Sequence, residues 1–81
     1  MMERKLEVKN EDGLQARVAA LFVRVANKYT SEITLEANGE RVNGKSIIGI
    51  MSLGIFGGET IKIYAEGPDS EEALNELSEI L

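Results

Sequence analysis

The chain contains neither cysteine nor histidine among its 81 residues. Without cysteine it forms no disulfides and no thiolate metal sites, and nothing indicates an oxidising compartment. Without histidine it lacks the commonest general base near neutral pH, the commonest metal ligand and the acceptor of phosphohistidine chemistry. No nucleophile–base pair can be assembled from the remaining residues except with lysine. We therefore expect no metal, no cofactor and no enzymatic activity.

Long apolar runs are also missing. None approaches the roughly 20 residues that a membrane span requires, and the first residues, MMERKLEVKNEDG, are too charged for a secretory signal. We therefore expect a soluble, cytoplasmic protein with no membrane partner. The formal net charge of −5 repels nucleic-acid phosphates, so we expect no direct nucleic-acid binding.

The charge is distributed unevenly along the chain. Acidic residues crowd the last third, whereas the basic residues cluster earlier, at Arg17, Arg24, Lys28, Arg41 and Lys45. A basic area on an acidic protein can dock an acidic partner. Ordinary solvated charge explains the same distribution equally well.

Local patterns in the sequence predict four strands. Alternating apolar and charged residues predict three of them: one around Leu6, one over 32–36 and one over 61–66. The pair Asn38-Gly39 predicts a hairpin, with a short return strand over 41–43.

Helical spacing predicts three helices. The first covers residues 16 to about 28 and the second covers 46–53. A third begins after Pro68, where Asp69 and Glu72 are spaced as a capping box. The order βαββαβα predicts one α+β domain over residues 1–81. In it, a four-stranded antiparallel sheet carries the three helices on one face and leaves the other face to water.

The segment SIIGIMSLGI is too apolar for a helix that buries a single stripe. Ile50 and Leu53 can face the sheet, but Ile48 and Met51 then point away from it, with Ile47 near the boundary. Exposed apolar patches on soluble proteins often mark partner surfaces. We therefore predict a partner surface here, the alternative being a more deeply buried helix.

The first helix has a related feature on its outward face. Leu21 stands there among Arg17, Ala20 and Arg24. An apolar anchor ringed by arginines suits a protein-binding surface. A single exposed leucine is also common in proteins without such a surface.

Ser46 opens the second predicted helix, where serine normally serves only as a cap. A phosphoryl group on Ser46 would place roughly −1.5 to −2 charges beside the positive end of the helix dipole. Lys45 would neutralise part of that charge. Ser46 can therefore be a switch that does not unfold the domain, and its charge would be felt at the neighbouring apolar surface.

Two segments, GLQARVAALFV at 13–23 and NGKSIIGIMSLGI at 43–55, are recognisable together. With the βαββαβα order, they resemble the histidine-containing phosphocarrier protein HPr of the bacterial sugar phosphotransferase system. The resemblance spans essentially the whole chain. The serine segment is similar to the Gram-positive branch of the family, in which HPr kinase/phosphorylase phosphorylates that serine. The fold that the resemblance implies is the HPr-like open-faced sandwich.

In HPr proteins the first segment reads G-L-H-A-R-P-A, and its histidine passes phosphate from Enzyme I to sugar transporters. In this chain Gln15 stands at the histidine position, Arg17 is retained and Val18 replaces the proline. A carboxamide nitrogen has its lone pair delocalised into the carbonyl, so it cannot act as the nucleophile that an imidazole provides. The resemblance therefore implies a degenerate carrier site, Gln15 and Arg17, with no transport function.

Glutamine at the carrier position with the serine retained resembles the catabolite-repression branch of the family. This implies that phosphorylated Ser46 makes the protein a corepressor that binds catabolite control protein A, a transcription factor. The docking surface carried over from the family comprises Gln15, Arg17, Ala20, Leu21 and Arg24 on the first helix and Ser46, Ile47, Ile48 and Met51 on the second.

Two alternatives stay open. The chain can be an HPr phosphocarrier made inactive at position 15, with no role of its own. It can also be a ferredoxin-like βαββαβ module that binds a small molecule or another subunit, in which case the order of the strands decides. The sequence does not give the oligomeric state.

Overall fold

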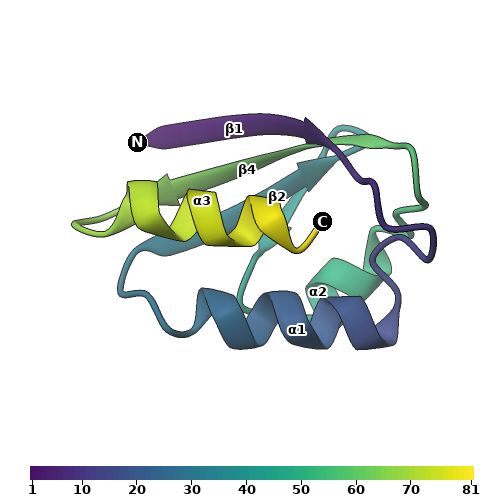
Figure 1. Ribbon diagram of the computed structural model, residues 1–81, viewed down its shortest axis with the longest axis horizontal. Coiled ribbons are helices and arrows are strands. Elements are labelled where there is room, and N and C mark those ends of the chain that lie inside the picture. The colour runs from purple at the N-terminus through teal and green to yellow at the C-terminus, as the bar shows by residue number, and fades with distance from the viewer.

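Seven elements follow one another in the predicted order βαββαβα in a computed structural model that describes residues 1–81 (Figure 1). The strands are β1 (Met2–Glu7), β2 (Glu32–Ala37), β3 (Glu40–Asn43) and β4 (Thr60–Glu66). The helices are α1 (Ala16–Ala26), α2 (Ile47–Ser52) and α3 (Ser70–Glu79). None of the helices has the length and apolar character of a membrane span.

The four strands form one sheet in the order β1-β4-β2-β3, and every neighbouring pair is antiparallel. β4 and β2 occupy the centre, and β1 and β3 are the edges. In a ferredoxin-like module the first strand lies inside the sheet, so that alternative is wrong for this chain.

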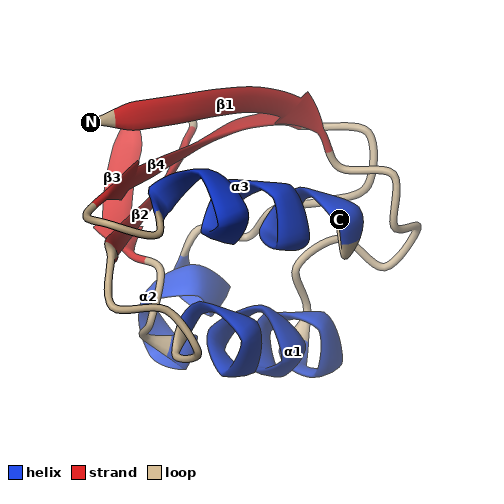
Figure 2. Cartoon of the chain, turned by 60° about the vertical axis from the view of Figure 1, so that its left-hand side comes forward, coloured by secondary structure: helices blue, strands red, loops and turns tan.

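All three helices lie on one face of the sheet (Figures 1 and 2). The layer between helices and sheet is filled by fully buried side chains, among them Phe22 of α1, Ile50 of α2 and Leu74 of α3. From the sheet, Leu35 of β2 and its register partner Ile63 of β4 point into the same layer, and both are fully buried. Each such side chain contributes about 1.5–3 kcal/mol through burial. The predicted fold class is confirmed.

The other face of the sheet carries polar side chains around Tyr64. Its hydroxyl donates to Glu36 Oε1 at 2.8 Å, and Arg41 Nε donates to the same oxygen at 2.8 Å. The Arg41 guanidinium also lies 4.6 Å from the Tyr64 ring centroid. These hydrogen bonds, first that of Tyr64 and then that of Arg41, hold the pKa of Glu36 below its usual value. The side chains of Arg41 and Glu36 contact Tyr64, which is buried although it lies on the outward face.

The start of α3 differs from the predicted capping box. Asp69 occupies the N-cap position, but its side chain does not cap α3. Oδ1 accepts hydrogen bonds from Ser31 Oγ at 2.5 Å and Ser31 N at 3.0 Å, and Oδ2 accepts one from Thr30 N at 3.0 Å. Because these donors converge from the α1–β2 loop, they take the carboxylate away from its own helix. The capping-box prediction for Asp69 and Glu72 is wrong, and Asp69 instead joins that loop to α3.

Candidate functional site

Ser46 is the N-cap of α2, as the sequence predicted. Its backbone is extended, and its Oγ accepts a hydrogen bond from Gly49 N at 3.1 Å. This is the only protein hydrogen bond of the Ser46 hydroxyl, and in it the oxygen is the acceptor. The residue is half-buried rather than sealed inside the core. The oxygen therefore satisfies a helix N–H while solvent still reaches the residue.

Lys45, next to Ser46, is directed elsewhere. Its Nζ donates to the backbone carbonyl of Tyr29, just beyond the end of α1, at 2.8 Å. In the unmodified chain the ammonium is thus bonded to Tyr29, and the prediction that Lys45 neutralises part of a phosphoryl charge on Ser46 stays a prediction. A charged donor forms a strong hydrogen bond with a carbonyl oxygen, and this accounts for its position.

The apolar residues of α2 divide between two faces as predicted. Ile50 and Leu53 face the core and are buried. Ile48 is 80% exposed, Met51 43% and Ile47 40%. The alternative of a deeply buried α2 is therefore wrong.

The neighbouring helix α1 also exposes an apolar residue on its outward face. α1 and α2 pack side by side (Figure 1), and Leu21 is 41% exposed. A shallow pocket of about 380 Å³ is lined by Asn10, Arg17, Val18, Ala20, Leu21 and Arg24. We use the name α1–α2 surface for Arg17, Ala20, Leu21, Arg24, Ile47, Ile48 and Met51. The structure brings all of these predicted partner-binding residues onto two adjacent helices.

Gln15 is the N-cap of α1. Its backbone is extended, its side chain makes no capping hydrogen bond, and the residue is exposed. Arg17 is also exposed, and its one ion pair, to Asp12, is long at 3.9 Å. The first turn of α1 contains no acidic residue that would offset the positive end of the helix dipole. The entrance to α1 is thus open and positively charged, with an inert amide at its tip.

Val18, which stands where the family has proline, is buried in the core. Proline is accepted in a first helical turn because its missing N–H has no partner there in any case. Valine fills the same space with an apolar side chain. Valine at position 18 is therefore compatible with a helix that begins at Ala16.

Phe56 is an exposed residue that the sequence analysis passed over. It lies in the loop after α2 and is 66% exposed, whereas its neighbour Ile55 is fully buried. The Ile55 carbonyl accepts a hydrogen bond from Leu14 N at 3.1 Å, which fixes the loop against the chain leading into α1. Adjacent side chains in an extended segment point to opposite sides. If Ile55 is buried, its neighbour Phe56 is therefore expected to be exposed, and this was the signal that the sequence offered.

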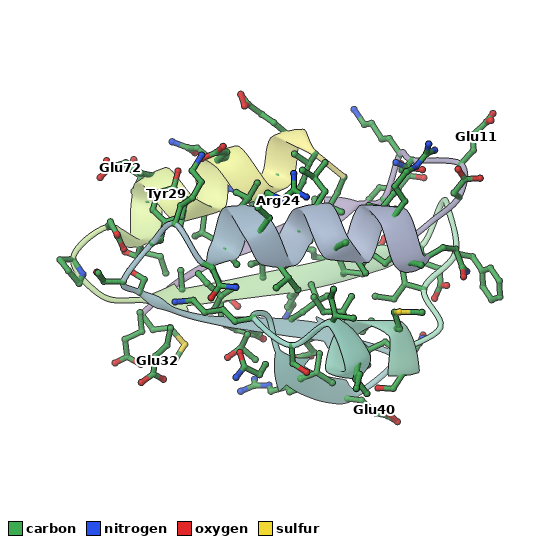
Figure 3. All side chains as sticks on the ribbon, turned by 90° about the horizontal axis from the view of Figure 1, so that it is seen from below. Glu11, Arg24, Tyr29, Glu32, Glu40 and Glu72 are labelled. Carbon is green, nitrogen blue, oxygen red and sulfur yellow. The ribbon has the colours of Figure 1, made fainter.

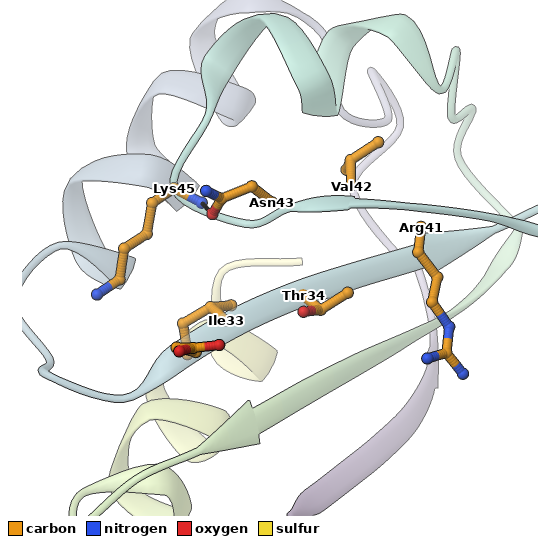
Figure 4. A pocket seen from close by; sticks show the side chains of 7 residues that line it. Ile33, Thr34, Arg41, Val42, Asn43 and Lys45 are labelled. Atoms are coloured by element: carbon orange, nitrogen blue, oxygen red, sulfur yellow. Dashed lines mark hydrogen bonds between the residues drawn. The ribbon is translucent and has the colours of Figure 1, made fainter.

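A separate pocket of about 400 Å³ lies between β2, β3 and the start of α2 (Figure 4). It is lined by Glu32, Ile33, Thr34, Arg41, Val42, Asn43 and Lys45. Charges of both signs line it, and it includes none of the predicted site residues. We assign it no role.

Comparison with known proteins places the chain in a family. Residues 2–81 match the family described as PTS HPr component phosphorylation site. The HPr-like protein Crh of Halalkalibacterium halodurans is 54% identical over 77 residues, which cover 95% of this chain and 92% of that protein.

Solved structures agree with this similarity. The phosphocarrier protein HPr of Bacillus anthracis has a TM-score of 0.96 at 48% identity, covering 99% of this chain and 95% of that one. Crh of Bacillus subtilis, described as a dimer with a swapped domain, has a TM-score of 0.79 at 48% identity, covering 99% of this chain and 92% of that one. The chain therefore belongs to the HPr family of the phosphotransferase system.

Proposed function

We propose that the chain is an HPr-like regulatory protein of carbon catabolite repression, switched when HPr kinase/phosphorylase phosphorylates Ser46. The observation that carries the proposal is the position of Ser46, half-buried at the start of α2 and directly before the exposed Ile47 and Ile48. A phosphoryl group there adds roughly −1.5 to −2 charges at the positive end of α2, where the helix tolerates them. The charge appears at the edge of the α1–α2 surface without disturbing the core.

The phosphorylated protein binds catabolite control protein A through the α1–α2 surface and acts as its corepressor. Leu21, Ile48 and Met51 supply exposed apolar anchors, and Arg17 and Arg24 supply charge at their side. Interfaces of this kind combine an apolar centre with a charged rim. The similarity to Crh supports this partner. The chain itself acts in the cytoplasm as a substrate and a binding partner.

Gln15 removes the carrier function in this account. Its exposed carboxamide stands at the entrance of α1 beside Arg17, but the amide nitrogen has no free lone pair to accept a phosphoryl group. The chain contains no histidine that could substitute for it. The protein therefore signals through Ser46 without drawing phosphate from sugar transport.

The proposal is tested by incubating the chain with HPr kinase and ATP and mapping phosphate by mass spectrometry. We expect one phosphoryl group, on Ser46, and none in the Ser46→Ala variant. An unmodified Ser46, or equal modification of the Ser46→Ala variant, would remove the proposal.

A phosphocarrier made inactive at position 15 is the second candidate. The exposed helix entrance and exposed Arg17 favour it, because the surroundings of a phosphate acceptor are retained. Under this candidate, the Gln15→His variant is rapidly phosphorylated by Enzyme I and phosphoenolpyruvate, while the unaltered chain does not bind catabolite control protein A even when Ser46 carries phosphate. Binding of the Ser46-phosphorylated chain to that repressor therefore separates the two candidates.

A further inference from the structure

The segment between β3 and α2 is tied to the end of α1 by one side chain. Lys45 is half-buried, and its Nζ donates to the Tyr29 carbonyl at 2.8 Å. Figure 4 shows the Lys45 side chain extending away from its neighbours Asn43 and Val42. A charged donor forms a stronger hydrogen bond than a neutral one.

The other hydrogen bonds of this segment do not reach α1. Lys45 N donates to Asn43 Oδ1 at 2.9 Å and Ser46 N donates to Asn43 O at 3.0 Å, so both are local. Gly44 N donates to Ile33 O at 2.7 Å, which ties the segment to the sheet. The Lys45 ammonium therefore supplies the hydrogen bond that sets the start of α2 relative to α1.

The acceptor of this bond is itself held firmly. The Tyr29 hydroxyl donates to a Glu76 carboxylate oxygen of α3, and Lys28 Nζ contacts the other oxygen at 2.7 Å. Figure 3 shows Tyr29 at the end of α1, on the side of Glu72. Lys45 is thus anchored to the loop that follows α1, at a residue whose side chain is bonded to α3.

We propose that Lys45 is a positioning residue for the phosphorylation of Ser46. Its bond to the Tyr29 carbonyl holds the first turn of α2 against the end of α1, so that the Ser46 hydroxyl and the α1–α2 surface are presented in one fixed arrangement. This inference rests on the proposed function at Ser46 and adds a residue that acts through the fold rather than by neutralising phosphate. Small displacements of a reacting group lower rates strongly, so loss of the bond reduces phosphorylation.

The test uses three variants of the full chain. Lys45→Met removes the ammonium and keeps an apolar stem, Lys45→Arg keeps a charged donor, and Lys5→Met is the control at an exposed lysine of β1. Steady-state kinetics with HPr kinase and ATP measure kcat and KM separately. Amide hydrogen exchange at Gly49, whose N–H bonds Ser46 Oγ, is measured by NMR without kinase.

We expect Lys45→Met to lower kcat/KM for phosphorylation about tenfold, chiefly in kcat, and to speed exchange at Gly49. Lys45→Arg restores most of both values, and Lys5→Met changes neither. Unchanged kinetics and exchange in Lys45→Met overturn the inference. A higher KM with unchanged Gly49 exchange also overturns it, because Lys45 then contacts the kinase directly. If the unaltered chain is not a substrate, the proposed function fails, whereas Gly49 exchange still decides the role of Lys45.

Discussion

Two residues at helix entrances carry opposite chemistry. Gln15 begins α1 with an exposed amide that makes no capping bond, and Ser46 begins α2 with a hydroxyl that caps it. Only the hydroxyl can be esterified, and in the unmodified chain its oxygen accepts the Gly49 N–H at the start of α2. The residue types at the two entrances therefore determine which of them can be a switch.

The capping role of Ser46 predicts a measurable loss of stability. Ser46→Ala removes the acceptor for Gly49 N, so we expect the free energy of unfolding to fall by about 1 kcal/mol. Ser46→Thr keeps the hydroxyl and stays within about 0.5 kcal/mol of the unaltered chain. Urea unfolding checks both values, and equal stability of all three proteins contradicts the capping assignment.

Asp69 predicts a dependence of stability on pH. Hydrogen bonds, first from the Ser31 hydroxyl and then from backbone N–H groups, lower the pKa of Asp69 from 3.8 to about 2. Because the folded-state pKa is depressed, its stabilisation is fully present above pH 3.8 and is lost as the pH falls towards 2.

We therefore expect Asp69→Asn to be less stable than the unaltered chain at pH 6, with the difference shrinking between pH 4 and pH 2. Asp12→Asn is the control at an exposed aspartate. Urea unfolding across this range measures the difference. A difference for Asp69→Asn that does not vary with pH contradicts the role given to its carboxylate.

The sequence predicted Ser46 correctly because an N-cap is a local feature that depends on the next three residues. The role of Asp69 was not predictable in the same way. Its partners, Thr30 and Ser31, lie 39 and 38 residues earlier. The bond from Lys45 to Tyr29 joins residues 16 apart in different elements, so no local pattern indicated it either.

At the scale of elements, α2 has two apolar faces with separate roles. Ile50 joins the core, while Ile48 lies on the α1–α2 surface. Helical spacing predicted this division, because four large apolar residues in a helix of six residues exceed what one buried stripe holds. The sequence did not indicate which neighbouring helix completes the surface, since that depends on packing.

We expect Ile48→Asp to weaken binding of the phosphorylated chain to catabolite control protein A by about tenfold or more, because truncated anchors commonly cost over 1 kcal/mol. The fold is unaffected, with stability within about 0.5 kcal/mol, since Ile48 is 80% exposed. Met2→Asp, an exposed apolar position on β1, is the control and keeps full affinity. Isothermal titration calorimetry measures binding, and equal affinity of the Ile48→Asp protein shows that α2 is not in the interface.

The contact between the end of α1 and α3 is also testable. The hydrogen bond to Glu76 raises the pKa of Tyr29 from 10.0 to about 12. Because the folded phenol holds its proton longer than the unfolded one, stability falls as the pH rises from 10 towards 12.

The Glu76→Gln variant should move the titration of one tyrosine back towards 10, as followed by ultraviolet absorbance. Tyr64 provides the internal comparison, because its raised pKa depends chiefly on Glu36. An unchanged titration curve would mean that Glu76 does not hold Tyr29.

At the scale of the whole molecule, the order of elements followed from periodicity, but the order of strands did not. β1 and β4 are neighbours although more than fifty residues separate them, and no local pattern encodes that pairing. The resemblance of GLQARVAALFV and NGKSIIGIMSLGI to HPr implied the open-faced sandwich, but the sequence predicted no order of strands. The fold then packs α1 against α2, so that the two sets of exposed residues noted in the sequence lie on neighbouring helices.

The central claim is that phosphate on Ser46 switches the α1–α2 surface towards the repressor. The direct measurement is the affinity of catabolite control protein A for the chain before and after phosphorylation by HPr kinase. We expect the phosphorylated chain to bind about tenfold or more tightly than the unphosphorylated one, in the usual range of coupling free energies. Equal affinity of the two forms would contradict the account.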